Sequence, residues 1–345
     1  MKYTTLPHSD IKVSKLCLGT MTWGNQNTQE EGFQQMDYAV EQGINFFDTA
    51  EMYPVPAQKE TYAETERIIG KWLKKTGKRS DIVLGSKIAG PGDYTAHIRT
   101  NGFAPEAIES AIESSLKRLQ TDYLDLFQLH WPERQSNFFG TRDYKHNPND
   151  PWADNFNEVL NSLEKAIKAG KIRNIGMSNE RAWGAMRYLE ESKYNNKPRM
   201  KTIQNAYSLI NRGFESDLAE IAMREGLGLL AYSPMAFGVL SGKYVQGLAK
   251  EDSRLNLFPR FSRYSSVNCT KATTQYLKIA EDNGLTLAQM SLAFVTQQPF
   301  VTSNIIGATR MEQLKENIDS IHVHLSDEIL AEINKVHEDI PNPAT

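Results

Sequence analysis

The chain has 345 residues, of which 40% are hydrophobic and 23% charged, as in globular proteins whose core needs no disulfide support. Its formal net charge of −3 disfavours nucleic acids and membrane surfaces as partners. It has two isolated cysteines, no apolar signal segment at its N-terminus and no apolar stretch long enough to cross a bilayer, so we expect a cytoplasmic protein.

Short apolar segments alternate with longer helical patterns along the chain. After a hairpin at 3–5 and 12–13, strands are expected at 15–20, 44–48, 82–87, 123–130, 172–178, 202–205, 227–233 and 304–307. Helices are expected at 28–42, 62–75, 105–119, 156–168, 180–192, 214–224, 286–297, 311–319 and 326–337. Apolar residues that recur at helical spacing, such as Ile108, Ile112 and Leu116, support these helices. The segments 89–104 and 132–155 are expected to be long loops.

Alternation of strands and helices predicts parallel strands joined by crossover helices. Eight such units are the number that closes a (β/α)8 barrel. We therefore predict the α/β class, and within it a TIM barrel with a short N-terminal hairpin and additional C-terminal helices. No linker composition divides the chain, so residues 1–345 are expected to form one domain.

Polar side chains end the predicted strands, where the active site of such a barrel lies. Asp48, Lys87 and His130 end the second, third and fourth strands. Each alone has an ordinary explanation, such as a turn residue or a solvated charge. Together they predict one site, in which Asp48 pairs with Lys87 because an unpaired charge inside a barrel is costly.

Over essentially its whole length the chain resembles the aldo-keto reductases. The motifs that carry the resemblance are, in chain order, Leu18–Met21, Asp48–Tyr53, Lys87, Leu124–Asp125 with His130, Gly176–Asn179, Gln204–Asn205, Tyr232–Pro234 and Gly307–Asn317. The chain is most similar to a bacterial branch and shares features with the β-subunits of voltage-gated potassium channels. The resemblance implies an NADP(H)-dependent oxidoreductase that reduces a small-molecule aldehyde or ketone to an alcohol.

The resemblance also implies the catalytic roles, with Tyr53 as the proton donor. A free tyrosine has a pKa of about 10, and a nearby ammonium lowers that pKa. Lys87 is expected to supply the ammonium, Asp48 to hold Lys87 in place, and His130 to orient the substrate carbonyl. Hydride must come from the nicotinamide, because no side chain can supply it.

Cofactor contacts follow from the same resemblance. They are expected at Thr20, Met21, Asp48, Ser178, Asn179, Gln204, Tyr232, Ser233, Pro234, Met235, Ala236, Phe237, Gly238, Val239, Leu240, Ser241, Gly242, Lys243, Arg254, Gly307, Thr309, Gln313, Glu316 and Asn317. Ser178, Asn179 and Gln204 are expected to bind the carboxamide, and Tyr232 to stack on the nicotinamide. The preference for NADP rests on Lys243, Arg254, Thr309 and Arg310 as possible partners of the 2′-phosphate.

The substrate pocket is expected to contain Trp23, Tyr53, His130 and Trp131. Two departures from the family pattern, the loops 54–60 and 132–155, are predicted to form the pocket wall together with the two tryptophans.

The sequence bears on two other functions. A redox-sensing subunit would bind NADP and turn over too slowly for catalysis to matter, and the similarity to channel β-subunits allows it. A metal-dependent hydrolase would need sets of histidine and carboxylate ligands that the sequence lacks, so no metal is expected. Gly226–Ala231 matches a dinucleotide fingerprint only formally, because its second half is itself a predicted strand. No oligomeric state follows from the sequence.

Overall fold

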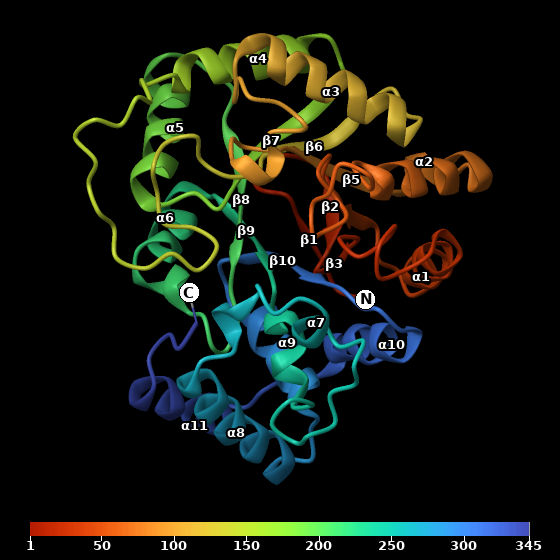
Figure 1. Cartoon of the computed structure of the whole chain (residues 1–345), viewed down its shortest axis with the longest axis vertical. Coiled ribbons are helices and arrows are strands. Elements are labelled where there is room, and N and C mark those ends of the chain that lie inside the picture. Colours follow the sequence, from red (N-terminus) through yellow and green to blue (C-terminus); the bar gives the residue numbers. More distant parts are fainter. Residues whose placement is uncertain (345) are drawn as a thin grey trace.

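The fold is a closed barrel of eight parallel strands surrounded by helices, as predicted (Figure 1). The computed structural model describes residues 1–344. Around the barrel the strands are β10 (Val301–Ile306), β3 (Leu16–Gly19), β4 (Phe46–Asp48), β5 (Val83–Ile88), β6 (Leu124–Leu129), β7 (Ile172–Ser178), β8 (Met200–Ala206) and β9 (Gly228–Tyr232). Sequential strands pair with each other, and β10 closes the barrel against β3.

Helices follow the strands in the order that a (β/α)8 barrel requires. They are α1 (Gln29–Glu41), α2 (Glu64–Thr76), α3 (Pro105–Leu119), α4 (Phe156–Lys168), α5 (Ala182–Tyr194), α6 (Leu218–Glu225), α7 (Arg254–Leu257), α8 (Val267–Asp282), α9 (Leu287–Gln297), α10 (Met311–Asp319) and α11 (Asp327–Asp339). Short 3-10 turns lie at η1 (Lys78–Asp81), η2 (Asp93–Thr95), η3 (Gly213–Ser216), η4 (Ala236–Ser241), η5 (Ser262–Tyr264) and η6 (Ser320–His322). No helix within residues 1–344 is long and apolar enough to span a membrane.

The barrel interior is apolar at its N-terminal end. The hairpin of β1 (Tyr3–Thr5) and β2 (Lys12–Ser14) lies at this end and contributes one side chain to the cluster. The cluster consists of Val13, Cys17, Phe46, Val83, Leu126, Leu230 and Ile305. Alternate residues of a strand face the same side, so positions two or four residues beyond these also point inward. Those positions, nearer the C-terminal ends of the strands, carry the polar side chains.

Two helical predictions need correction. Residues 267–282 form α8, which packs against α11 and was not expected from the sequence. Its buried face contains Cys269, Ala272 and Thr273, and small or polar residues of this kind give a weak hydrophobic pattern. The helix expected at 214–224 is divided into η3 and α6 by Asp217, whose φ of −147° is not helical.

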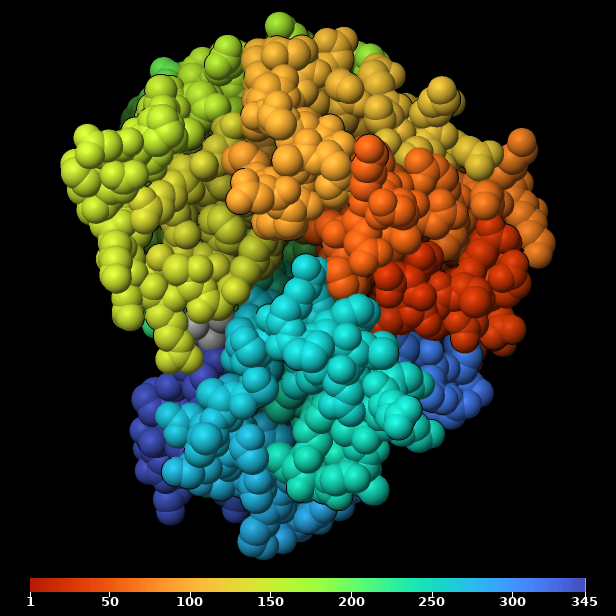
Figure 2. Space-filling view, in the orientation of Figure 1, coloured from red at the N-terminus to blue at the C-terminus, as the bar shows by residue number. Residues whose placement is uncertain are grey.

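Three segments that follow strands surround the barrel mouth. They are the stretches after β4 (orange), β6 (yellow-green) and β9 (cyan), and Figure 2 shows the cyan stretch projecting between the other two. All three contribute residues to one large cavity.

Candidate active site

The predicted pair of Asp48 and Lys87 forms inside the barrel. Lys87 Nζ donates to Asp48 Oδ2 at 2.7 Å and to the Thr49 carbonyl at 2.7 Å. The Lys87 side chain is 0% exposed and that of Asp48 only 3%. The strand register explains the contact: Asp48 lies beside Gly85, and Lys87 is the next inward-facing residue of β5.

Asp48 also accepts hydrogen bonds from two glutamine side chains. Gln128 Nε2 lies 3.2 Å and Gln204 Nε2 2.8 Å from Asp48 Oδ1. A buried carboxylate needs such donors to offset its loss of water. Gln128 was not predicted from the sequence. Its signal was a polar residue inside the apolar run of β6, two positions before His130 and therefore on the same face.

Tyr53 lies beside this pair, although it is not on a strand. Lys87 Nζ lies 4.9 Å from the centroid of the Tyr53 ring, and the imidazole of His130 is 5.7 Å from it, centroid to centroid, in an edge-to-face arrangement. The loop is held by backbone hydrogen bonds from Tyr53 to Ala50 and from Val55 to Met21. The structure therefore brings all four predicted catalytic side chains together.

The pKa of Tyr53 is raised above its ordinary value, which corrects the expected lowering. Burial of the phenol is the largest cause, and it outweighs the opposing effect of the Lys87 ammonium. Asp48 adds to the increase. Tyr53 consequently keeps its proton at neutral pH, and Lys87 limits the increase without reversing it.

Lys87 and His130 differ in charge. Burial favours neutral Lys87, but the Asp48 carboxylate and the Tyr53 hydroxyl oppose this and raise the Lys87 pKa overall. Burial, and then the Lys87 charge, hold the pKa of His130 well below its ordinary value. The site at neutral pH thus contains an ammonium, a phenol and a neutral imidazole with one N–H to donate.

A cavity of about 910 Å³ opens above these residues. Among the predicted cofactor residues it is lined by Thr20, Met21, Asp48, Ser178, Asn179, Gln204, Tyr232, Ser233, Pro234, Met235, Phe237, Gly238, Ser241, Lys243, Arg254, Gly307, Thr309, Gln313, Glu316 and Asn317. Four predicted contacts, Ala236, Val239, Leu240 and Gly242, do not line it. The first three belong to η4, and their side chains pack into the core and away from the cavity.

The residues expected at the carboxamide are joined to one another and to His130, which follows β6. Ser178 Oγ donates to the Gln204 carbonyl at 2.7 Å. The Asn179 side chain donates to the His130 carbonyl at 2.8 Å and accepts from the Tyr232 hydroxyl at 2.6 Å. The Asn179 side chain thus holds Tyr232 and the backbone at His130 in fixed positions relative to each other.

The cavity wall offers several cations. The Arg254 guanidinium is buried over the Phe237 and Phe261 rings. Its hydrogen-bond partners within residues 1–344 are the neutral Gln26 and Met21, and its Nε has none. Burial lowers the Arg254 pKa to about 10, so it stays charged at neutral pH. Gly238, at φ +88°, brings its backbone so near Lys243 that a Cβ there would lie 3.1 Å from Lys243 Nζ. Arg310 is paired with Asp252 across the cavity.

The two tryptophans expected in the substrate pocket do not line the cavity. Trp23 is 0% exposed in the core against α1, where its Nε1 donates to Gln35. Trp131 stacks behind Tyr94 at 5.5 Å and contacts Phe139 at 5.7 Å, centroid to centroid. Tyr94 and Phe139 themselves face the cavity.

The two unusual loops contribute in part to this wall. The loop 54–60 provides Val55 and Ala57, and the loop 132–155 provides Phe139 and Gly140. Tyr94, from the loop 89–104, was not expected in the wall. Nothing in the local sequence distinguishes Tyr94 from a surface tyrosine, because only the folding of its loop over β5 and β6 brings it to the cavity.

Comparison with known proteins agrees with this geometry. The model of the aldo/keto reductase family matches residues 15–338. The chain is 49% identical to "Protein tas" of Escherichia coli (strain K12) over 100% of both chains. It is 32% identical to "Uncharacterized oxidoreductase YrpG" of Bacillus subtilis (97% of this chain, 96% of the relative). It is 31% identical to a "Probable voltage-gated potassium channel subunit beta" of Arabidopsis thaliana (94% and 92%).

Proposed function

Because this chain belongs to the aldo/keto reductase family and is an oxidoreductase, we propose that it reduces an aldehyde or ketone to an alcohol with NADPH. Tyr53 is the proton donor in this proposal. The observation that carries it is the contact between a buried tyrosine and a buried ammonium, with Lys87 Nζ 4.9 Å from the Tyr53 ring centroid.

Each side chain has a separate task in the proposed reaction. Tyr53 holds the proton that the carbonyl oxygen receives as it becomes an alkoxide. Lys87 stabilises negative charge on the tyrosine oxygen once that proton has left. Asp48 holds Lys87 through a 2.7 Å hydrogen bond. Neutral His130 donates an N–H toward the carbonyl oxygen and so orients the substrate for proton transfer.

The residues of the cavity fit a nicotinamide dinucleotide. The buried Arg254 has no carboxylate partner within residues 1–344, as expected where a phosphate group is to be bound. Gly238, which has no side chain, leaves its backbone open to the pyrophosphate. Tyr232, held by Asn179, offers a ring face to the nicotinamide. When bound, the cofactor supplies the hydride that no side chain can provide.

The preference for NADP rests on Lys243, because Arg310 is engaged by Asp252. We expect Lys243→Ala to raise the Kd of NADPH about tenfold, the value of one charge-assisted hydrogen bond, and to change that of NADH much less. Fluorescence titration with both cofactors measures this. Lys271→Ala, at an exposed position of α8, is the control. An equal loss for both cofactors would assign Lys243 to the pyrophosphate instead.

Substrate preference is expected to depend on Tyr94 and Phe139. Replacing either by alanine should raise KM for aromatic aldehydes about threefold to tenfold, because an aromatic contact contributes about 1 kcal/mol. The Kd of NADPH should not change. Tyr144→Ala provides the control, since Tyr144 lies on the same loop as Phe139 but is 61% exposed. Equal KM values for all three variants would remove these residues from the substrate wall.

A steady-state assay with NADPH and a panel of aromatic and aliphatic aldehydes tests the proposal itself. We expect turnover that disappears in Tyr53→Phe. The relatives include a probable potassium channel β-subunit, so a second function, a redox-sensing subunit that binds NADP, has a specific basis. Tight NADPH binding without turnover on any aldehyde or ketone would favour that second function.

A further inference from the structure

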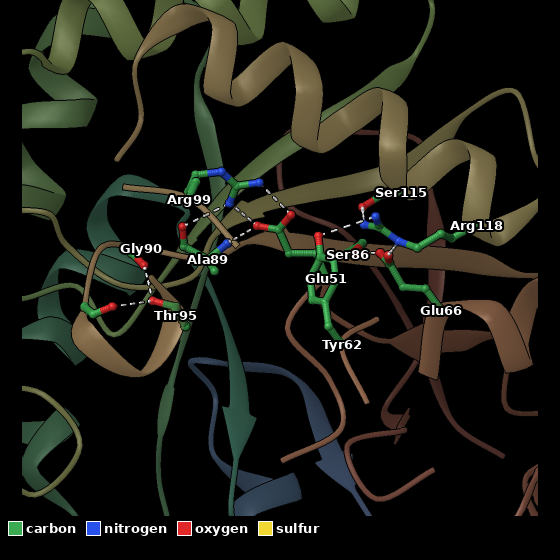
Figure 3. A network of polar contacts seen from close by, with 11 residues as sticks. Glu51, Tyr62, Glu66, Ser86, Ala89, Gly90, Thr95, Arg99, Ser115 and Arg118 are labelled. Carbon is green, nitrogen blue, oxygen red and sulfur yellow. Dashed lines mark hydrogen bonds and ion pairs between the residues drawn. The ribbon is translucent and has the colours of Figure 1, made fainter. Parts of the chain in front are cut away.

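Two buried glutamate–arginine pairs lie in one network of polar contacts around β5 (Figure 3). Glu51 is paired with Arg99 and Glu66 with Arg118, and both glutamate side chains are 0% exposed. Buried charges are expensive, and such a pair often contributes little to stability. Stability alone therefore does not explain the two pairs. Each has different contacts, and these indicate different roles.

Glu51 connects the loop that carries Tyr53 to the strand that carries Lys87. Its backbone N–H donates to the Lys87 carbonyl at 3.2 Å, and its Oε1 accepts from the backbone N–H of Ala89 at 2.6 Å. Arg99 forms an ion pair with the same carboxylate, and its Nη2 donates to Oε2 at 2.7 Å. Tyr53 follows Glu51 by two residues. Through these bonds Glu51 joins the loop that carries Tyr53 to the end of the strand that carries Lys87.

Glu66 makes contacts of the same kind on the outer side of β5. Its Oε1 accepts from Ser86 Oγ at 2.6 Å, and its Oε2 accepts from Arg118 Nε at 2.6 Å. Ser86 alternates with Lys87 along the strand, so its side chain faces the helices rather than the barrel interior. This second pair joins α2 and α3 to the strand. It contacts the loop between β4 and α2 at Tyr62, whose hydroxyl accepts from Arg118 Nη1 at 3.5 Å, nine residues after Tyr53 and at the α2 end of that loop.

We propose that Glu51, held by Arg99, is a positioning residue that sets the distance between Tyr53 and the Lys87 ammonium. The inference rests on the proposed function of Tyr53 as proton donor. Lys87 counteracts the effect of burial on the Tyr53 pKa, and that effect weakens as the two groups separate. Loss of the Glu51 carboxylate therefore moves Tyr53 away from Lys87 and raises the Tyr53 pKa further.

Glu51→Gln is the informative substitution, because it keeps the size of the side chain and removes one acceptor. With its oxygen in the place of Oε1, the amide still accepts from Ala89 and from Arg99 Nη1, but its NH₂ then faces Arg99 Nη2 and the bidentate hold on the loop is lost. We expect kcat to fall about tenfold with KM for NADPH nearly unchanged, as for loss of an interaction that acts on the transition state. The apparent pKa in the pH profile of alcohol oxidation should rise by about one unit, because a tenfold smaller acid dissociation constant of Tyr53 is one pKa unit.

Glu66→Gln is the matched control. It breaks the same kind of buried pair and should lower the melting temperature by a similar amount, yet leave kcat and the pH profile as in the wild type. Arg99→Lys is the conservative variant, since it keeps a cation beside Glu51. We expect it to retain most of kcat. Arg99→Gln, which removes the cation that holds Glu51, replaces Glu51→Gln if that variant does not fold.

The outcomes separate the inference from the function on which it rests. If the wild type reduces aldehydes and the Glu51 and Glu66 variants have the same pH profile, Glu51 is only structural and the inference fails alone. If the wild type reduces no carbonyl compound, the proposed function fails. Hydrogen exchange of the wild type and both variants then decides on positioning: faster exchange at residues 49–55 in Glu51→Gln alone supports it, and equal exchange overturns it.

Discussion

Replacing Tyr53 by phenylalanine is expected to lower kcat for carbonyl reduction by about 10³-fold, within the range that general acid catalysis contributes. The ring remains, so its packing against Lys87 and His130 is kept and only the hydroxyl proton is lost. The Kd of NADPH should therefore stay within about twofold of the wild type, because uniform binding is not touched. Steady-state kinetics together with cofactor fluorescence measure both quantities.

The pH dependence of the wild type follows from the same residue. The Tyr53 pKa is raised by burial, so the phenol is protonated at neutral pH. Reduction needs the phenol and should be lost only as pH rises through that pKa, whereas alcohol oxidation needs the phenolate and should increase there. His130 stays neutral above its lowered pKa and should add no inflection near 6.5. A Tyr53→Phe variant that keeps both the rate and the alkaline limb would remove Tyr53 from the reaction.

Lys87→Met is expected to destabilise the fold by about 3–5 kcal/mol, the usual result of removing one partner from a buried ion pair. The Asp48 carboxylate keeps its hydrogen bonds from Gln128 and Gln204 but loses its counter-ion. Activity should also be lost, because the Tyr53 pKa rises further without the ammonium. Urea unfolding measures the first effect, and the aldehyde assay the second.

Its control is the double variant Asp48→Asn with Lys87→Met, which removes both charges. Most of the lost stability should return, since no uncompensated charge remains buried. Activity should not return, because Tyr53 still lacks the ammonium. Recovery of both properties would mean that the lysine serves only to neutralise Asp48.

The strand endings made three of the four proposed catalytic side chains predictable from the sequence. Asp48, Lys87 and His130 end consecutive strands, and a parallel barrel brings such ends to one mouth. Tyr53 lies in a loop, so only the family motif identified it. Gln128 was overlooked within an apolar strand, although its spacing from His130 placed it inside the barrel.

The predictions that were wrong concern residues whose role depends on their surroundings in the fold and not on the type of side chain. Trp23 is an aromatic residue near the mouth, yet it packs into the core, whereas Tyr94 reaches the cavity from a distant loop. Helix α8 was not predicted, because its buried face gives only a weak hydrophobic pattern. The sign of the Tyr53 pKa shift was also wrong, because the sequence shows that a lysine is available but not how deeply the phenol is buried.

The sequence by itself determined the order of strands and helices, the closed barrel and the polar ends of three strands. These depend on periodicity and on spacing along the chain, which are local properties. The tertiary structure alone decided which groups share charge, which aromatic rings face the cavity, and that Glu51 joins the segments of Tyr53 and Lys87. Those properties depend on burial and on distances between residues remote in sequence, and such quantities exist only once the barrel has closed.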